Sequence, residues 1–453
     1  MARMKTISPS TRWIVLVLVS VVIATNYYVY DAMSSIKSVM QTQLGIDNTA
    51  YGLIVSFYSF PNTFLLMSIF GGIILDKWGI RKTGFLFVLV CFLGALTTAY
   101  GASDSFARGG VVYGIFDSFL PSYSPQLKMM MLGRLLFGLG AETSIVVINK
   151  IIVKWFKGKE LAFAFAVNVA IARLGTALAL IFSPQLIKDP VGWTWALWVA
   201  AIAMGVGFVF FLIYMMYDSA TTPKGSRDGA LAADEEFHMS DIVELLKNRS
   251  FIYVILLCVT FYSAVFPFQA YCPDLLHNKF GLDIEWSGIL SSLIIWGTIL
   301  FTPLFGAFVD RKGKRASLML VGSFLLIATH LILSLTHVTP YVAMFILGIA
   351  FSLVPASMWP SVALIVEEKR LGTAYGMMAA LQNLGLWGFP ILAGYILDTT
   401  NPGVTETTVA SGAAMFDYTW TILMFAVLGF FGFFFAIMLK REDAKAGNKL
   451  ELA

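Results

Sequence analysis

One short pattern occurs twice in this chain, and its two copies are in register. The first copy runs from Gly72 to Lys82 and the second from Gly306 to Arg315. Gly, Asp, Gly and Arg recur at one offset, since 306 minus 72 and 315 minus 81 both equal 234. Each copy follows one long apolar stretch and precedes another. A repeat of this period in an apolar chain predicts two membrane-spanning halves related by internal duplication.

Composition supports a membrane protein. Of the 453 residues, 58% are hydrophobic and 13% are charged, and the mean hydropathy is +0.79. A soluble domain carries about 25% charged residues. This deficit excludes a chain of soluble domains and predicts an all-α membrane protein in which most side chains face lipid or other apolar helices.

The apolar stretches predict twelve spanning helices, since one span needs about 20 apolar residues. We expect them near residues 13–36, 50–75, 82–102, 127–150, 161–182, 193–217, 251–275, 286–309, 316–336, 340–366, 372–397 and 417–439. The longest polar stretch between helices divides them six and six. It predicts a first bundle at 1–217, a cytoplasmic linker at 218–250 with a short amphipathic helix from Ser240, and a second bundle with a cytoplasmic tail at 251–453.

The basic residues predict the orientation of the chain. With the N-terminus inside, 24 of the 31 Lys and Arg residues fall on the cytoplasmic side and five on the other. The remaining two, Arg134 and Arg173, fall within spans. Because cytoplasmic loops are enriched in Lys and Arg, we expect both termini, and both copies of the repeated pattern, on the cytoplasmic side.

This arrangement resembles the major facilitator superfamily, whose fold is two pseudo-symmetric six-helix bundles. The repeated pattern resembles the loop motif of that superfamily, in which an Asp caps a neighbouring helix, pairs with the Arg and locks the two halves in one state. The resemblance implies these gating roles for Asp76, Gly79 and Arg81, and for Asp310, Gly313 and Arg315 in the second copy. A carboxylate is also favourable at the positive end of a helix.

Charged residues inside predicted spans are candidates for function, because each one costs about 2.5–3.5 kcal/mol at the centre of an isolated helix. Three stand out, Arg134, Glu142 and Arg173, and Asp31 lies deeper than a loop residue should. Arg134 precedes Gly138 and Gly140, and this run resembles a second superfamily motif. Its glycines allow close helix approach. A structural or gating role for Arg134 and direct contact with substrate both remain open.

Glu142 and Arg173 are the strongest pair of candidates. At 1.5 Å per residue, Glu142 lies about 12 Å and Arg173 about 20 Å from the cytoplasmic end of its helix. This separation suits a zwitterion, with an ammonium group at Glu142 and a carboxylate on the fork of Arg173. The alternative is a salt bridge that only neutralises both groups. The two interpretations are compatible if the pair opens when substrate arrives.

A narrower resemblance concerns the lysosomal dipeptide transporters of the superfamily. It rests on Arg134–Glu142, Trp155–Leu161, Ala172–Gly175, Met358–Ala363, Leu371–Gly376 and Gln382–Gly385, with Tyr30-Asp31 and Tyr58–Asn62. The resemblance implies general dipeptide uniport, with Glu142 and Arg173 holding the two ends of the peptide. Other residues on the helices expected to face the cavity are further candidate substrate contacts: Tyr28, Tyr30, Asp31, Tyr58, Asn62, Asn168, Tyr262, Gln269, Trp296, Trp359, Asn383 and Trp387. In so aromatic a chain, packing or an interface belt explains many single Trp and Tyr residues equally well.

The chain departs from the lysosomal members in its first twelve residues, which carry no recognisable sorting signal. We therefore expect the plasma (bacterial inner) membrane, or the lysosomal membrane if the source is eukaryotic. The lysosomal members use an accessory subunit, which this sequence does not indicate, and the superfamily is mostly monomeric. We expect a monomer with a small-molecule substrate and the lipid bilayer as its partners, and no nucleic acid.

Other function classes are weakly supported. The three Cys and four His residues show no metal-ligand spacing, and the sequence has no phosphate loop and no nucleophile triad. We therefore predict no cofactor, no metal and no enzymatic activity. A secondary transporter working by alternating access is favoured, as a uniporter or proton-linked through Glu142 or Asp31. The alternative is an organic-anion or sugar carrier of the same superfamily, which should tolerate loss of Glu142.

Overall fold

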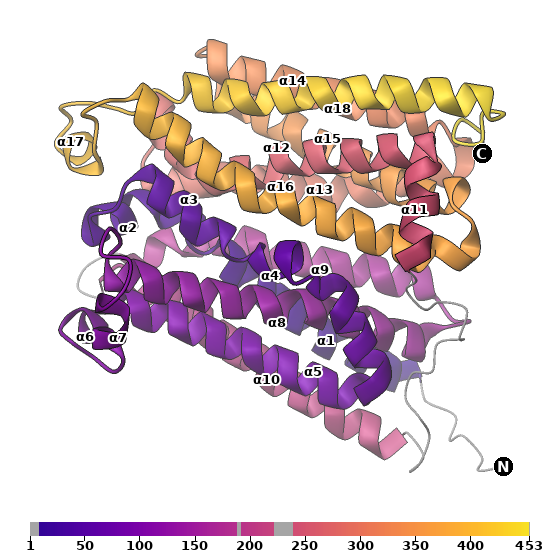
Figure 1. Cartoon of the computed structure of the whole chain (residues 1–453), viewed down its shortest axis with the longest axis horizontal. Coiled ribbons are helices and arrows are strands. Elements are labelled where there is room, and N and C mark those ends of the chain that lie inside the picture. The colour runs from indigo at the N-terminus through magenta and orange to yellow at the C-terminus, as the bar shows by residue number, and fades with distance from the viewer. Residues whose placement is uncertain (1–8, 188–191, 222–238, 453) are drawn as a thin grey trace. The chain divides into compact units, whose positions relative to one another are not determined.

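The computed structural model describes residues 9–187, 192–221 and 239–452, which are largely helical and contain no β-strand (Figure 1). Within these ranges, eleven helices are long and apolar enough to cross a membrane. The sequence predicts twelve. The difference lies in the second expected helix, 50–75, whose residues are divided among three helices. The chain is nonetheless an all-α protein with the composition of a membrane protein.

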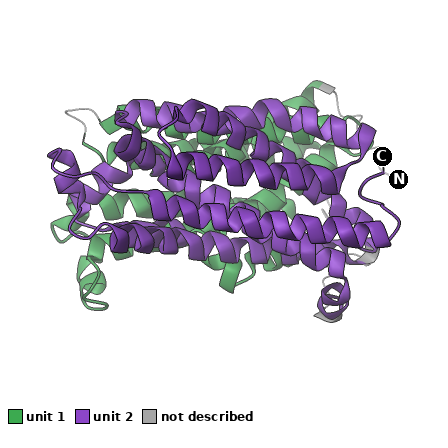
Figure 2. Ribbon diagram, turned by 90° about the horizontal axis from the view of Figure 1, so that it is seen from above, with its two compact units in different colours: residues 1–33, 57–232 green, residues 34–56, 233–453 purple. Residues whose placement is uncertain are grey.

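The first compact unit contains residues 1–33 and 57–232, drawn in green in Figure 2. Its described elements are α1 (Pro9–Asp31), α4 (Phe60–Phe64), α5 (Met67–Ala102), α6 (Asp104–Ala107), α7 (Tyr113–Asp117), α8 (Pro125–Phe156), α9 (Leu161–Phe182), η2 (Pro184–Ile187) and α10 (Trp195–Thr221). α5 packs along α8, and α1 packs against both α9 and α10. The candidate charges of this unit therefore lie on mutually packed helices.

The second unit contains residues 34–56 and 233–453, drawn in purple in Figure 2. Its elements are η1 (Ser34–Ile36), α2 (Lys37–Leu44), α3 (Asn48–Ser56), α11 (Met239–Lys247), α12 (Arg249–Phe280), α13 (Ile284–Lys312), α14 (Arg315–Leu335), α15 (Pro340–Ile365), η4 (Glu368–Arg370), α16 (Leu371–Thr400), α17 (Glu406–Ala410) and α18 (Thr419–Lys445). α14 packs against α15 and α18, and α12 packs against α16 and α18. The short helix α11 begins beside Ser240, where the sequence predicts one.

One segment belongs to a different unit from the one that the sequence predicts. Residues 34–56 fall within the expected first bundle, but their contacts place them in the second unit, where α3 packs along α16. Hydrophobic patterning does not carry this information, because it reports that a segment is buried and not which helices bury it. The other expected boundaries remain predictions. Residues 222–238, which form most of the expected linker, lie outside the described part of the chain.

The second expected helix is interrupted where its backbone departs from helical geometry. Leu66 has φ 50° and separates α4 from α5, and Pro61 lies at the start of α4. Gly79, in the first copy of the repeated pattern, has φ 80° and ψ 166° inside α5. A residue with a side chain rarely adopts such a conformation, which explains why glycine occupies the centre of the expected loop between residues 75 and 82.

Close backbone approaches hold the helices of the first unit together. A Cβ atom added to Gly138 of α8 would lie 1.9 Å from the carbonyl oxygen of Tyr58, and one added to Gly175 of α9 would lie 2.0 Å from that of Ala24. Neither carbonyl can move without moving its own helix or turn. The sequence predicts that Gly138 allows another segment to approach α8 closely. The Tyr58 backbone beside it explains why a residue with a side chain does not fit there.

We predict that Gly138→Ala destabilises the protein by about 1–3 kcal/mol, because the added methyl group overlaps a backbone atom. The measurement is the thermal unfolding of the detergent-purified protein. Gly388→Ala in α16 is the matched control, since a Cβ atom there meets nothing within 4 Å. Equal melting temperatures for the two variants would contradict the packing described above.

Candidate functional site

Tyr58 links two charged residues of α8, Arg134 and Glu142. Its hydroxyl donates a hydrogen bond to Oε1 of Glu142 at 2.9 Å. The centroid of its ring lies 5.6 Å from the guanidinium carbon of Arg134. Gly138 lies one helical turn from each of these residues, and the backbone of Tyr58 rests against it. One aromatic residue therefore spans the face of α8 that carries both charges.

Arg134 is a fixed, buried cation. It is only 1% exposed, and Nη1 donates to the carbonyl oxygens of Val29 and Tyr30 at 3.3 and 3.4 Å. The centroid of the Tyr30 ring lies 5.3 Å from its guanidinium carbon, and the rings of Tyr30 and Tyr58 form a T-shaped pair with centroids 4.6 Å apart. Carbonyl and aromatic contacts of this kind stabilise a guanidinium away from water. They favour the structural interpretation of Arg134 over direct contact with substrate.

Arg173 lies on α9 and is half-buried. Its guanidinium carbon is 5.4 Å from the centroid of the Tyr27 ring on α1. One turn further along α9, the hydroxyl of Thr176 donates to Oδ2 of the buried Asp31 at 2.7 Å. The contact between α1 and α9 therefore carries one cation and one carboxylate, in addition to the pair on α8.

The first unit therefore contains a half-buried carboxylate, Glu142, and a half-buried guanidinium, Arg173. Glu142 is oriented by Tyr58, and Arg173 is oriented by Tyr27. An ordered carboxylate accepts charged hydrogen bonds from an ammonium group, and a guanidinium group binds a carboxylate through two parallel hydrogen bonds. The chemistry suits a ligand that carries both charges.

The remaining predicted contacts of the first unit differ in their surroundings. Asn62 is fully buried and its Oδ1 accepts from Ser68 at 3.0 Å. Asn168 is buried and its Oδ1 accepts from Ser20 at 3.0 Å, which ties α9 to α1. Tyr28 is half-buried on α1. The hydrogen bond of Asn168 is typical of helix packing, so this residue has a structural explanation for its position.

In the second unit, two of the predicted aromatic residues, Tyr262 and Trp359, contact each other. The indole Nε1 of Trp359 donates to the hydroxyl of Tyr262 at 2.9 Å, and Tyr375 donates to the carbonyl oxygen of Trp359 at 3.3 Å. Tyr375 and Trp359 are also stacked, with ring centroids 6.0 Å apart. The other candidates of this unit differ in burial. Gln269 is buried, Asn383 bonds the Ala379 carbonyl of its own helix, Trp387 is half-buried, and Trp296 is 42% exposed.

The first copy of the repeated pattern makes ion pairs that the sequence did not identify. Nε of Arg81 lies 2.6 Å from Oδ2 of Asp218 at the end of α10, and Lys154 lies 2.9 Å from the other oxygen of that carboxylate. Asp76 pairs with Lys150 at 2.5 Å. The carboxylate of Asp218 is fully buried, whereas that of Asp76 is 46% exposed. Asp218 is therefore the central acceptor of this cluster.

The second copy is arranged differently. The expected pair of Asp310 with Arg315 is not formed within the described residues, and the side chain of Arg315 donates instead to the carbonyl oxygen of Leu452. The C-terminal residues cover this end of α14, where the Arg315 amide donates to the Leu450 carbonyl at 2.8 Å and Glu451 accepts from the Ser317 amide at 2.8 Å. A carboxylate is favourable at a helix N-terminus, which explains the attachment of the tail.

Sequence reasoning missed Asp218, Lys154, Tyr27 and Thr176. The first two lie at the ends of predicted spans, where charges are common and carry little signal. Tyr27 and Thr176 are uncharged, and only the packing of α1 against α9 gives them a role. An acidic residue at the expected cytoplasmic end of an apolar helix, opposite a basic loop, was the one available indication for Asp218.

The decisive comparison concerns the whole chain. A family model described as Major Facilitator Superfamily matches residues 16–385 and, separately, 272–452. The chain belongs to the Major Facilitator Superfamily. It is an integral membrane protein and a transporter of that family, and its described helices and bundle architecture agree with the fold expected from the repeat.

Relatives and solved structures agree on the family and differ in substrate. The chain is 28% identical over 403 residues to the lysosomal dipeptide transporter MFSD1 of Bos taurus, covering 86% of this chain and 80% of the relative. It is 23% identical to the hexuronate transporter of Bacillus subtilis (strain 168), covering 86% and 89%. A variant of the nucleoside transporter NupG has a TM-score of 0.69 at 16% identity, covering 94% of this chain and 99% of that chain. A bacterial homologue of the human lysosomal transporter Spinster, in an inward-facing and occupied conformation, has a TM-score of 0.67 at 16% identity and covers 97% and 98%.

We predict that Asp218→Asn destabilises this superfamily member by about 1–3 kcal/mol, because two cations lose the charge of their shared buried acceptor. Asp76→Asn should change stability by less than about 0.5 kcal/mol, since its carboxylate is half-exposed and the pair is screened by water. Thermal unfolding of both variants in one detergent measures the difference. A larger effect for Asp76→Asn would contradict the central position of Asp218.

Proposed function

We propose that this transporter moves dipeptides or similar small zwitterions across its membrane by alternating access. The observation that carries the proposal is the pair of half-buried opposite charges, Glu142 on α8 and Arg173 on α9, each oriented by a tyrosine. The similarity to lysosomal dipeptide transporters over most of the chain supports the same substrate class.

Glu142 and Arg173 lie at similar depths in their helices. Glu142 is 14 residues from the end of α8 at Phe156, and Arg173 is 12 residues from the start of α9 at Leu161. At 1.5 Å per residue these depths are about 21 and 18 Å. Two opposite charges at nearly one level suit a small zwitterion, and the preference for a dipeptide is supported by the similarity to lysosomal dipeptide transporters.

The remaining predicted residues complete the proposal. Tyr28, Tyr30, Asp31, Tyr58, Asn62 and Asn168 of the first unit, and Tyr262, Gln269, Trp296, Trp359 and Asn383 of the second, are proposed substrate contacts. Asp76, Gly79, Arg81 and Arg134, with Asp310, Gly313 and Arg315, are proposed gating residues, and Asp218 joins them because it holds Arg81. Transport is by uniport or linked to protons. The proposed orientation places both termini in the cytoplasm, in a plasma membrane or in a lysosomal membrane of a eukaryote, with the chain working as a monomer.

A second candidate is a carrier of sugar acids. Relatives at 23% identity include a hexuronate transporter and a probable galactarate/D-glucarate transporter from Escherichia coli (strain K12). A sugar acid offers a carboxylate for Arg173 but no ammonium group for Glu142. The two candidates therefore differ in whether Glu142 contributes to binding.

The deciding experiment pairs changes in the protein with changes in the ligand. The affinity of a dipeptide, its N-acetylated form and its C-terminal amide is measured by thermal stabilisation of the purified wild type, Glu142→Gln and Arg173→Gln. We predict that acetylation or Glu142→Gln alone weakens binding roughly 10–100-fold, as expected for a charged hydrogen bond. Acetylation should have little further effect in Glu142→Gln, because the partner of the ammonium is already removed. In the same way, amidation of the peptide C-terminus should weaken binding to the wild type but have little further effect in Arg173→Gln.

Two outcomes would overturn the dipeptide proposal. Additive effects of acetylation and Glu142→Gln would mean that the two groups do not meet. Stabilisation by hexuronate or glucarate, but not by any dipeptide, with full retention in Glu142→Gln, would support the sugar-acid carrier instead. Glu368→Gln serves as the control variant, because this exposed carboxylate has no proposed role and the change should leave the ligand series unchanged.

A further inference from the structure

The segment 34–56 joins α1 and α4 of the first unit but is held by the second. It comprises η1, α2 and α3, and its contacts are with helices from α12 onward. Both of its ends continue directly into residues of the first unit. Any movement of the first unit that carries this segment along must therefore break the contacts that hold it.

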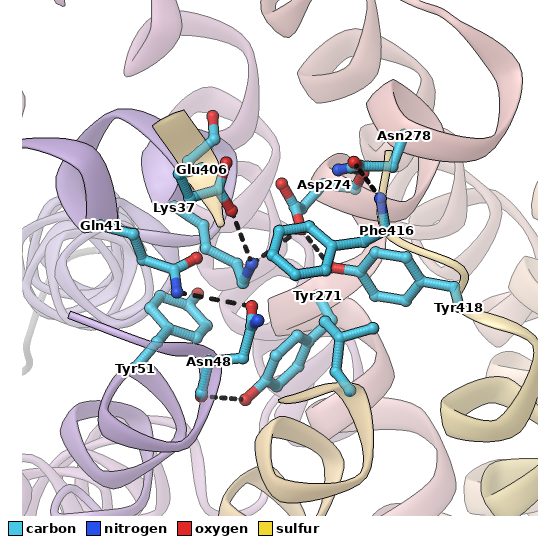
Figure 3. A network of polar contacts seen from close by, with 12 residues as sticks. Lys37, Gln41, Asn48, Tyr51, Tyr271, Asp274, Asn278, Glu406, Phe416 and Tyr418 are labelled. Carbon is cyan, nitrogen blue, oxygen red and sulfur yellow. Dashed lines mark hydrogen bonds and ion pairs between the residues drawn. The ribbon is translucent and has the colours of Figure 1, made fainter. Parts of the chain in front are cut away.

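One end of the segment is anchored by a buried charge cluster, which we call the Lys37 cluster (Lys37, Asp274, Glu406 and Tyr418; Figure 3). Nζ of Lys37 lies 2.7 Å from Oδ2 of Asp274 on α12 and 3.5 Å from Oε1 of Glu406 on α17. The hydroxyl of Tyr418 donates to the same oxygen of Asp274. The exposed fractions of the three charged side chains are 0%, 1% and 5%. The segment thus inserts a cation between two carboxylates of its host unit.

The cluster has one positive charge for two carboxylates. Asp274 Oδ1 is buried and accepts no hydrogen bond, and Glu406 Oε1 has only the 3.5 Å ion pair with Lys37. The rings of Tyr51, Tyr271 and Phe416 lie 5.6–5.7 Å from Nζ of Lys37 and bring no further charge. An unbalanced negative charge and empty acceptor atoms in a water-poor site are costly, and a proton on one carboxylate relieves both costs.

Other titratable groups lie near the cluster. His277 lines the same small cavity as Lys37 and Asp274, and its Nδ1 lies 2.7 Å from the carbonyl oxygen of Leu282. Asp47 and Asp398 add negative charge near Tyr271. Glu406 lies outside the spanning helices, and its pKa is raised to about 7 by burial and by the charge of Asp274, with only partial compensation from Lys37.

The other end of the segment is anchored without a buried titrating pair. The carboxylate of Asp398 on α16 accepts four hydrogen bonds, from the amides and side chains of Asn48 and Thr49, at 2.6–3.1 Å. These bonds satisfy the free N–H groups at the start of α3. Further along, Cβ atoms added to Gly52 and Gly394 would meet opposing backbone oxygens at 2.3 and 2.1 Å. The proton-dependent part of the attachment is therefore at Lys37.

We propose that the Lys37 cluster is a proton-binding site, which takes one proton from water when segment 34–56 docks on the second unit and returns it to water when the segment leaves. The proton resides on the carboxylate pair, chiefly on Glu406, and no other bond is made or broken. This inference goes beyond the substrate proposal and does not depend on it.

The sign of the linkage follows from the raised pKa. Glu406 binds its proton more tightly when the segment is docked, at a pKa of about 7, than when it is exposed near the ordinary 4.5. Docking is therefore weakened as the pH rises from about 4.5 to about 7, and changes little beyond either limit. Within this window each undocking event releases up to one proton.

Cysteine labelling without substrate tests the proposal. The native Cys91, Cys258 and Cys272 are buried and are replaced by alanine. A reporter thiol is placed at Ser35, which is buried in η1 and lines the same cavity, and a reference thiol at the exposed Thr42 of α2. The ratio of their maleimide labelling rates cancels the effect of pH on the thiol itself. We predict that this ratio rises several-fold between about pH 4.5 and about pH 8.

Two variants identify the group that titrates. Glu406→Gln, which imitates the protonated residue, should give a low and pH-independent ratio, whereas the exposed Glu368→Gln should behave as wild type. Lys37→Gln removes the compensating cation. The midpoint of the pH dependence of the labelling ratio should therefore move to higher pH in this variant. A pH-independent ratio in wild type would overturn the proposal. So would a wild-type pH profile that persists in Glu406→Gln.

If Glu406→Gln does not fold, infrared spectroscopy of the wild type tests whether a buried carboxyl group titrates in this pH range. A protonated buried carboxyl band that disappears as the pH rises through about 7 would support the proposal, and the absence of any carboxyl titration in this range would overturn it.

Discussion

Charge compensation without water is the constraint on which the rest of this structure depends. A charged side chain at the centre of a bilayer costs several kcal/mol unless the protein itself supplies its partners. Arg134 is compensated by two carbonyl oxygens and two aromatic faces, and Lys37 by two carboxylates. Each compensated charge fixes the relative position of at least two helices, so the charged sites and the packing of the bundle are parts of one arrangement.

The clusters differ in how completely they are balanced, and this difference separates structural from functional charges. Asp218 receives two cations, whose side chains are 32% and 28% exposed and are therefore also hydrated. Glu142 is contacted by neutral side chains, Tyr58 and Asn62, and the Lys37 cluster has more negative charge than positive. An incompletely balanced site gains more from a charged ligand than a balanced one does, because the ligand supplies the missing partner. A zwitterion at Glu142 and Arg173, and a proton at Glu406, are the ligands whose charges fit.

The two copies of the repeated pattern show how duplicated halves diverge. In the first copy the Arg pairs with a buried carboxylate at the end of α10. In the second copy, Asp443 of α18 accepts a hydrogen bond from the amide of Leu450 in the C-terminal tail. The side chain of Arg315 donates to the backbone of the same tail. The tail therefore occupies the position at which a second ion pair would form. Symmetry in sequence preserved the turn at Gly79 and Gly313, both at positive φ, but did not preserve the contacts around it.

The sequence by itself determined the class of the protein. Apolar stretches of spanning length and the repeat at Gly72 and Gly306 depend only on local composition and spacing, so they predicted an all-α membrane protein with two duplicated halves. The superfamily came from the resemblance of the repeated pattern to a known motif, and the family model confirms it. Charges inside apolar stretches are also visible locally, and this signal singled out Glu142, Arg173 and Arg134. Their interpretation as a dipeptide clamp still depends on experiment.

Only the tertiary structure decided which groups meet. Tyr58 as the link between Arg134 and Glu142, Asp218 as the acceptor for Arg81, and segment 34–56 as part of the second unit all depend on contacts between residues far apart in the chain. Hydrophobic periodicity reports that a helix face is buried, but many partners could bury it equally well. The partner is chosen by close packing at glycines such as Gly138 and by the need to compensate each buried charge, and both are properties of the folded chain as a whole.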